Sequence, residues 1–338
     1  MRFSQFASTL ALGILGLGAL PAGAIELDQY PEIRAFIDEL VDQHGFARDK
    51  LERTFRQTRF RQEIIDSIER PKEALPYHQY RELFVTTQNR NRGQRFWRKH
   101  AETLRHAEQT YGVAPEVIVG ILGVETSYGR NKGRYPVMDA LTTLTVAYPP
   151  RAAFFKRELA EYLLLTRELD INPLKIKGSY AGALGIAQFI PSSYRQYAVD
   201  FNGDGKRDLI GSPADAIGSV ANFLRRHGWT PHAPVASDAR VEGTLYTWVE
   251  KLGIRPILSV RDLGNYGIHP AVAVTSPTVD GTAPTTAALV TVEGRVGPIY
   301  RLAYNNFYVI TRYNRSSRYA MAVYELSQEI RAVMPPET

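Results

Sequence analysis

The sequence predicts a mainly α-helical protein with a smaller β-containing part, an α+β fold. Apolar residues recur at helical spacing over much of the chain, as at Ile33, Phe36, Ile37 and Leu40. Strand character is confined to a later region rich in Pro, Thr, Val and Gly, around 288–292. With 44% hydrophobic and 22% charged residues among 338, the composition is that of a globular protein with one large or two moderate domains.

Residues 1–24 have the pattern of a secretory signal peptide. Arg2 is their only charged residue, an apolar run follows, and small residues at 22–24 supply a cleavage site. The apolar run is too short, and too rich in Gly and Ala, to predict a membrane span. The chain has no Cys, so we expect neither a disulfide nor a lipid attached to cysteine. These features predict a soluble periplasmic protein that starts near Ile25 and has no membrane anchor.

The surplus of basic residues predicts an acidic partner. Lys and Arg number 41 against 35 Asp and Glu, and without Arg2 the mature net charge is 40 − 35 = +5. An exported protein rarely meets nucleic acid, so we expect no nucleic-acid partner and favour an anionic cell-wall polymer. A solvated basic face without a partner is an equal alternative for any one of these residues.

A helix predicted at about 115–128 carries the candidate general acid, Glu125. Pro115 marks its first turn, Gly129 follows its end, and apolar residues at helical spacing lead up to Glu125. Burial and a place in the last turn, where the helix dipole disfavours negative charge, both predict a raised pKa for this carboxyl. A carboxyl that is neutral near pH 7 can act as a general acid. A solvent-facing Glu at a frayed helix end is an equal alternative on this pattern alone.

A glycine-rich segment at 177–191 has polar groups that suit a sugar. Gly178, Gly182 and Gly185 permit tight turns and close approach of the backbone to a ligand. Gln188 lies inside an apolar run, and a buried amide must both donate and accept hydrogen bonds. A Gln satisfied by the local backbone is the alternative.

Residues 200–215 resemble a calcium-binding loop. Oxygen-bearing side chains stand at loop positions 1, 3, 5 and 9, and Gly at position 6: Asp200, Asn202, Asp204, Asp208 and Gly205. Position 12 is Gly211, where an EF-hand carries Glu, so Asp215 is the candidate to close the site. Asp215 also fits a helix cap that starts at Ser212. An Asx-rich turn without metal is the alternative for the whole loop.

No motif for a Ser, His or Cys nucleophile, a zinc protease or a phosphate-binding loop is present. A carboxylic acid among amide and aromatic side chains points to carbohydrate chemistry. Glycosidic cleavage needs protonation of the leaving oxygen and usually a second carboxylate. Asp139 and Asp170 are candidates by position only, and substrate-assisted chemistry needs neither.

Four ordered blocks, 123–130, 178–209, 212–229 and 305–326, closely resemble the lytic murein transglycosylase B family. The resemblance implies a lysozyme-like catalytic core within a helical domain. It also implies non-hydrolytic cleavage of the MurNAc–GlcNAc β-1,4 bond in peptidoglycan, which ends in 1,6-anhydro-MurNAc.

The resemblance implies roles for individual residues. Glu125 matches the single catalytic acid and base, while Ser179 and Gln188 match positions near the muramoyl sugar. Further substrate contacts fall at Tyr308, Tyr313 and Asn314. No cofactor is implied for catalysis. A structural Ca²⁺ is implied, with the ligands Asp200, Asn202, Asp204, the Lys206 carbonyl and Asp215.

We therefore expect, after the signal peptide, one transglycosylase at 25–338. Its parts are a helical segment (25–110), a core (about 111–230) that includes the 200–215 loop, a β-containing insertion (about 231–300) and a C-terminal cleft segment with a helix (301–338). We expect a monomer that binds glycan strands and leave cell-wall synthesis proteins open as partners. A hydrolytic muramidase and a non-catalytic peptidoglycan-binding protein are the alternatives.

Overall fold

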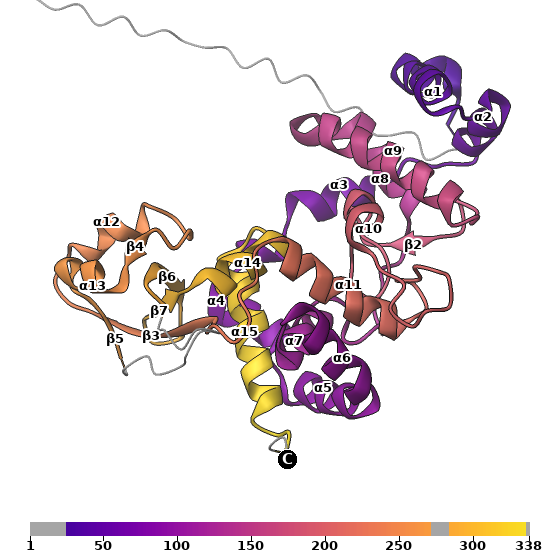
Figure 1. Cartoon of the computed structure of the whole chain (residues 1–338). Coiled ribbons are helices and arrows are strands. Elements are labelled where there is room, and N and C mark those ends of the chain that lie inside the picture. The colour runs from indigo at the N-terminus through magenta and orange to yellow at the C-terminus, as the bar shows by residue number, and fades with distance from the viewer. Residues whose placement is uncertain (1–24, 272–283, 336–338) are drawn as a thin grey trace, which may run out of the picture.

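The computed structural model describes residues 25–271 and 284–335, and the predicted signal peptide at 1–24 lies outside them. The described chain is mainly helical, with a small antiparallel sheet to one side (Figure 1). This confirms the predicted α+β class. No helix among the described residues combines the length and the apolar character needed to cross a membrane.

The first part of the chain is a series of helices whose apolar faces point inward. They are α1 (Pro31–His44), α2 (Arg48–Arg56), α3 (Gln62–Glu69), α4 (Tyr77–Phe84), α5 (Thr87–Lys99) and α6 (Ala101–Tyr111), with short 3-10 turns η1 (Leu27–Gln29) and η2 (Lys72–Ala74). On α1 the apolar set used for the prediction is buried. Burial of one helical face is what its spacing dictates.

Next along the chain come the helices that form the centre of the molecule. They are α7 (Pro115–Thr126), α8 (Val137–Ala147), α9 (Ala152–Glu168), α10 (Pro191–Tyr197) and α11 (Pro213–Arg226), joined in part by η3 (Pro149–Arg151) and the short strand pair β1 (Tyr135–Pro136) and β2 (Lys177–Gly178). The predicted cap of α11 is confirmed, because the Asp215 N–H donates to the Ser212 Oγ at 3.2 Å.

Helix α7 is buried almost all round rather than along one stripe. The helix expected to reach 128 ends at Thr126, because Ser127, Tyr128 and Gly129 all take left-handed φ values, of 48°, 64° and 84°. This sharp reversal of the chain leaves Glu125 in the last turn, half-buried.

The sheet has the strand order β4-β6-β7-β3-β5, and all of its neighbouring strands are antiparallel. Its elements are β3 (Ala236–Val241), α12 (Tyr246–Glu250), β4 (Leu258–Ser259), α13 (Val260–Leu263), η4 (Gly264–Tyr266), β5 (Ile268–Pro270), β6 (Thr286–Glu293) and β7 (Pro298–Ala303). Alternate residues of β6 face opposite sides. Ala287 and Leu289 enter a small core of the sheet region, whereas Val290 and Val292 join the main core.

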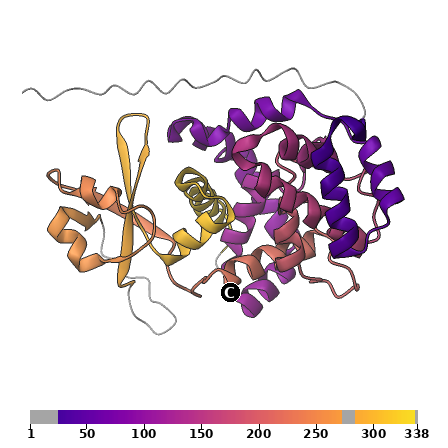
Figure 2. The same cartoon turned by 90° about the horizontal axis from the view of Figure 1, so that it is seen from above.

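The chain ends with α14 (Asn305–Tyr313) and α15 (Ser317–Arg331), which lie between the sheet and the helical body (Figure 2). Helix α15 packs closely on α7 because α7 has glycines at the contact. A Cβ on Gly120 would lie 3.0 Å from the Val323 carbonyl oxygen, and one on Gly123 would lie 2.9 Å from the Leu326 Cδ2. This close approach brings the start of α15 to the end of α7, where Glu125 stands.

Candidate active site

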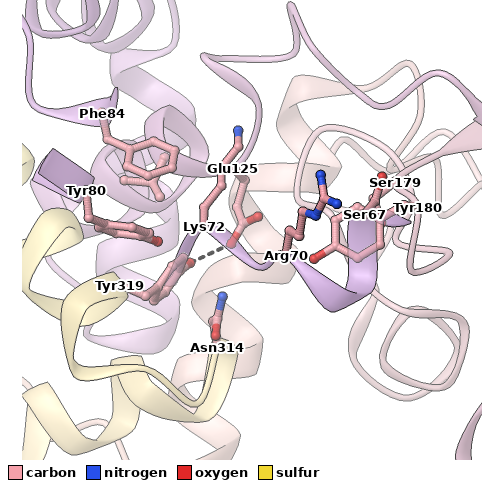
Figure 3. A pocket seen from close by; sticks show the side chains of 11 residues that line it. Ser67, Arg70, Lys72, Tyr80, Phe84, Glu125, Ser179, Tyr180, Asn314 and Tyr319 are labelled. Atoms are coloured by element: carbon pink, nitrogen blue, oxygen red, sulfur yellow. Dashed lines mark hydrogen bonds between the residues drawn. The ribbon is translucent and has the colours of Figure 1, made fainter. Parts of the chain in front are cut away.

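A cavity of about 370 Å³ opens over the end of α7 (Figure 3). Its lining comes from the α3–η2 segment, α4, α7, the glycine-rich segment and the α14–α15 junction. The lining residues are Ser67, Arg70, Lys72, Tyr80, Phe84, Val124, Glu125, Ser179, Tyr180, Asn314 and Tyr319. The structure thus brings together three of the sequence-predicted site residues, Glu125, Ser179 and Asn314.

Glu125 is the only carboxylate among the described residues that line this cavity. Tyr319, on the first turn of α15, donates a hydrogen bond of 2.6 Å from its hydroxyl to Glu125 Oε1. A short hydrogen bond to a carboxylate is stronger than one between neutral groups and orients its acceptor. The packing of α15 on α7 therefore holds the candidate acid in one direction.

Tyr319 remains a neutral donor over the whole working pH range. Burial, and after it the negative charge of Glu125, raises the pKa of Tyr319 well above its usual value. The ring of Tyr313 lies parallel to that of Tyr319, with 6.4 Å between centroids and 10° between planes. Burial, and then Glu125, also raises the pKa of Tyr313.

The glycine-rich segment reaches the cavity through Ser179 and Tyr180. The Ser179 Oγ accepts from the N–H groups of Ala181 (3.2 Å) and Ala183 (3.0 Å), so its oxygen sets the turn as well as facing the cavity. The turn is tied to α7 because Thr126 Oγ1 donates to the Ile186 carbonyl at 2.8 Å. The segment and Glu125 are thereby held relative to each other.

Gln188, Tyr308 and Tyr313 are not among the residues that line the cavity. The Gln188 amide nitrogen donates to the carbonyls of Gly185 (2.8 Å) and Lys132 (3.2 Å), so the local backbone takes up its donor side. The Tyr313 hydroxyl donates to the carbonyl of Ala187. Their sugar contacts stay predictions, and in the structure Gln188 and Tyr313 brace the loop around the site.

The two carboxylates considered as partners of Glu125 lie elsewhere. Asp139 is buried and accepts from the Arg59 N–H at 3.0 Å and the Arg61 Nε at 2.7 Å. Asp170 lines a different cavity, with Arg167 and Pro173. Neither lines the Glu125 cavity.

In the 200–215 loop the predicted ligands are oxygen donors of the kind that Ca²⁺ prefers. Asp200 accepts from the N–H groups of residues 203, 204 and 205, and the Asn202 side chain donates to Asp204 Oδ2 at 3.0 Å. Asp215 is buried, and its carboxylate accepts from the N–H groups of Phe201 (2.9 Å) and Asp208 (2.8 Å), which closes the loop from both ends. Among the described residues, no group of three or more His, Cys, Asp or Glu side chains is arranged to hold a metal. The types of donor suit a hard cation, whereas in this arrangement the Asp200 and Asp215 oxygens accept hydrogen bonds from backbone N–H groups of the loop.

Most of the cavity lining was not predicted from the sequence, including Tyr80, Tyr319 and the cations Arg70 and Lys72. Tyr319 had one usable signal, since it begins an apolar helical face, with Val323 and Leu326, that predicts burial next to the core. The other three lie in a helical segment with no mark of function in its pattern.

The fold and the site together define a class of protein: a glycan-cleaving enzyme with a lysozyme-like core, whose candidate acid, Glu125, stands at the end of a buried helix. Residues 28–328 match the family model described as "Transglycosylase SLT domain". The chain is 38% identical over 310 residues to membrane-bound lytic murein transglycosylase B of Escherichia coli strain K12, covering 89% of this chain and 82% of that protein. The chain therefore belongs to the lytic transglycosylase family, lyases that act on peptidoglycan, which confirms the resemblance found in the sequence.

Solved structures agree with this assignment. Soluble lytic transglycosylase SltB1 from Pseudomonas aeruginosa is 45% identical with a TM-score of 0.81, over 89% of this chain and 99% of that one. The Escherichia coli lytic transglycosylase Slt35 in complex with calcium is 37% identical with a TM-score of 0.80, over 92% and 96%. SltB3 from Pseudomonas aeruginosa in complex with NAG-anhNAM-pentapeptide is 28% identical with a TM-score of 0.75, over 91% and 82%.

Proposed function

We propose that this enzyme cleaves the MurNAc–GlcNAc β-1,4 bond of peptidoglycan without water and leaves a 1,6-anhydro-MurNAc end. The observation that carries the proposal is that a single carboxylate, Glu125, lines the described part of the cavity. A hydrolase of the two-carboxylate type needs a second one at the same cavity. Binding of an anhydro-MurNAc peptide by the relative SltB3 supports the same product class.

In the proposed mechanism Glu125 acts first as acid and then as base. Its proton passes to the glycosidic oxygen, the bond to C1 breaks, and the GlcNAc hydroxyl leaves. The N-acetyl group of MurNAc stabilises the positive charge at C1. The Glu125 carboxylate then takes the proton of the C6 hydroxyl of MurNAc, and the C6 oxygen forms a bond to C1. The carboxyl ends protonated as it began, and no water is consumed.

The neighbours of Glu125 serve this cycle. The hydrogen bond from Tyr319 keeps the carboxyl pointed through both steps, since Tyr319 stays neutral. Ser179 and Asn314 place polar groups beside the reacting sugar, and Tyr180 adds aromatic surface on which a sugar ring packs. Pre-positioned donors of this kind are what stabilise developing charge in enzymes.

The test is the mass of the products released from sacculi, with wild type compared with Glu125→Gln. We expect products one water lighter than hydrolytic ones, no incorporation of heavy oxygen from labelled water, and no product from Glu125→Gln. Glu116→Gln is the matched control, because it removes a carboxyl from the first turn of the same helix, outside the cavity. Reducing-end MurNAc carrying heavy oxygen would establish the muramidase instead. Equal release of products by wild type and Glu125→Gln would show that Glu125 is not the catalytic group.

We also infer that the 200–215 loop binds a structural Ca²⁺ through Asp200, Asn202, Asp204 and the Lys206 carbonyl, with Asp215 completing the set. The calcium complex of the relative Slt35 supports this inference. The loop lies outside the Glu125 cavity, so the metal takes no part in bond cleavage.

We propose that the enzyme works in the periplasm after removal of residues 1–24. Ile25 is buried and its backbone nitrogen donates to the Thr58 carbonyl at 3.2 Å, so the predicted mature end is packed against the fold. The mass of the protein recovered from the periplasm tests this proposal, and a mass that includes residues 1–24 would contradict it.

A further inference from the structure

The proposed mechanism gives no role to the strained chain reversal that follows Glu125. Ser127 and Tyr128 both lie in the left-handed region, with φ 48° and 64°. Residues with a Cβ rarely adopt this backbone, and strain of this kind persists only where the surrounding structure enforces it. Contacts from elsewhere in the fold must therefore hold this turn, directly behind the helical turn that carries the candidate acid.

Those contacts come from α5, which packs against α7 (Figure 1). The Ser127 Oγ donates to Asn89 Oδ1 at 3.0 Å and accepts from Arg92 Nη1 at 3.1 Å. The Tyr128 hydroxyl donates to the Asn89 carbonyl at 3.2 Å, and its ring stacks on that of Phe96 with 5.4 Å between centroids. One helix therefore holds both of the strained residues.

The Asn89 side chain also joins two elements that line the cavity around Glu125. Its amide nitrogen donates to the Gly123 carbonyl of α7 at 3.2 Å and to the Phe84 carbonyl, at the end of α4, at 2.9 Å. Phe84 and Glu125 both line that cavity (Figure 3). Asn89 is buried, and with Ser127 as its third partner both amide hydrogens and the amide oxygen are engaged. The position thus requires a short side chain with two donors and one acceptor.

We propose that Asn89 is a positioning residue for Glu125, an inference that rests on the proposed function. Together with Ser127 it keeps the last turn of α7 from fraying, and that turn carries the acid. Helix ends fray because their last carbonyls lack partners within the helix. Here the Gly123 carbonyl accepts from the Ser127 N–H, at 3.1 Å, and also from Asn89. Asn89 does not line the cavity, so it acts on the reaction through the backbone that carries Glu125.

Two helices then share the control of one carboxyl. Tyr319 of α15 orients the Glu125 side chain through its hydrogen bond to Oε1, whereas Asn89 of α5 fixes the backbone from which that side chain extends. A general acid must come within hydrogen-bond distance of the oxygen that it protonates, and a misplacement of about 1 Å can cost about a hundredfold in rate. The side-chain bond from Tyr319 cannot supply this precision if the helical turn beneath Glu125 moves.

The experiment measures kcat and KM on soluble peptidoglycan strands, and the melting temperature, for wild type and four variants. Asn89→Ala removes the amide, and Ser127→Ala removes the hydroxyl but keeps the strained backbone. Ser127→Gly removes the same hydroxyl and relieves the strain, since glycine adopts φ 48° readily. The control Gln94→Ala removes an amide of α5 that donates to the Val333 carbonyl at 2.7 Å, outside the Glu125 cavity.

We expect Asn89→Ala to lose about ten- to a hundredfold in kcat with KM within about threefold, because every side chain that lines the cavity stays. Both Ser127 variants should lose about tenfold in kcat. Ser127→Gly should melt at a higher temperature than Ser127→Ala and yet be no more active, and this pair decides the question even if Asn89→Ala does not fold. Gln94→Ala should keep kcat within about threefold.

Three results overturn the positioning role. One is an unimpaired kcat in Asn89→Ala or in the Ser127 variants, and another is a loss that falls on KM. The third is a set of kcat values that follows the melting temperatures, with Gln94→Ala impaired to the same extent, because a residue that only stabilises the fold gives that result.

The products of wild type and Glu125→Gln separate this proposal from the proposed function. If wild type releases hydrolytic products while Asn89→Ala still loses kcat, only the transglycosylase mechanism fails. If wild type releases anhydro products, Glu125→Gln releases none and Asn89→Ala keeps its full kcat, only the positioning role fails. If Glu125→Gln is as active as wild type, both proposals fail.

Discussion

Replacing Tyr319 by Phe tests whether α15 orients the Glu125 carboxyl. The change removes one hydroxyl, which donates to Glu125 Oε1 at 2.6 Å, and leaves the buried ring in its parallel contact with Tyr313. A hydrogen bond to a charged group contributes about 1.5–3 kcal/mol. If that contribution acts in the transition state, kcat/KM falls about 10- to 150-fold, at 1.4 kcal/mol for each factor of ten.

The assay is the rate of release of soluble muropeptides from sacculi, at substrate concentrations where the rate is proportional to kcat/KM. The matched control is Tyr324→Phe, which removes from the same helix a hydroxyl that donates to the Ala236 carbonyl at 3.0 Å, outside the Glu125 cavity. We expect the control to keep its rate within about threefold, since its lost bond is between neutral groups and stabilises the fold by only about 1 kcal/mol. A Tyr319→Phe enzyme as fast as wild type, or a control equally impaired, would refute the orienting role.

Three further predictions concern stability. Gly185→Ala should lower the free energy of unfolding by about 2–5 kcal/mol, because φ is +71° and a Cβ would lie 2.1 Å from the Leu209 carbonyl oxygen. Gly45→Ala is the control, because Gly45 has φ +64° but open space around it, and its free energy of unfolding in urea should fall by only about 1–2 kcal/mol. Equal losses of unfolding free energy in the two variants would contradict the packing argument. Glu158 is buried with bonds from Ser192 N (3.0 Å) and Oγ (2.8 Å), and burial raises its pKa. A raised folded-state pKa gives a contribution to stability that is fully present below the unfolded value, about 4.3, and lost as pH rises through the folded value. Glu158→Gln should therefore flatten the fall in stability above that pH, and an unchanged pH profile of urea midpoints would argue against it. Finally, adding Ca²⁺ after chelation should raise the melting temperature, because a ligand at 100 times its Kd stabilises the folded state by about 2.7 kcal/mol. If the melting temperature rises no more with Ca²⁺ than with Mg²⁺, the inferred calcium site is wrong.

Local features of the site follow from the sequence because their causes lie within a few residues. Pro115 and the apolar run place Glu125 in the last turn of α7, and Ser212 with Pro213 starts α11 as predicted. Glycines at 178, 182 and 185 mark the turn that presents Ser179. Each of these is a matter of capping, backbone freedom or helical periodicity, which act along the chain.

Contacts between distant segments could not be predicted in this way. Tyr319 stands 194 positions from Glu125, and only the close packing of α15 on the glycines of α7 joins them. The packing of α3 against α8 likewise decides that Asp139 is a buried partner of Arg61 and lies outside the Glu125 cavity. Arg70 and Lys72, two ordinary basic residues in the sequence, become part of the site because the α3–η2 segment lies across the cavity.

By itself, the sequence determined the α+β class, the place of Glu125 in the last turn of its helix and the glycine-rich turn. The tertiary structure alone decided which groups surround that acid. Helical periodicity specifies which face of an element is buried, but not which other element covers it. That choice depends on how well the faces fit, here a small-residue face of α7 against α15.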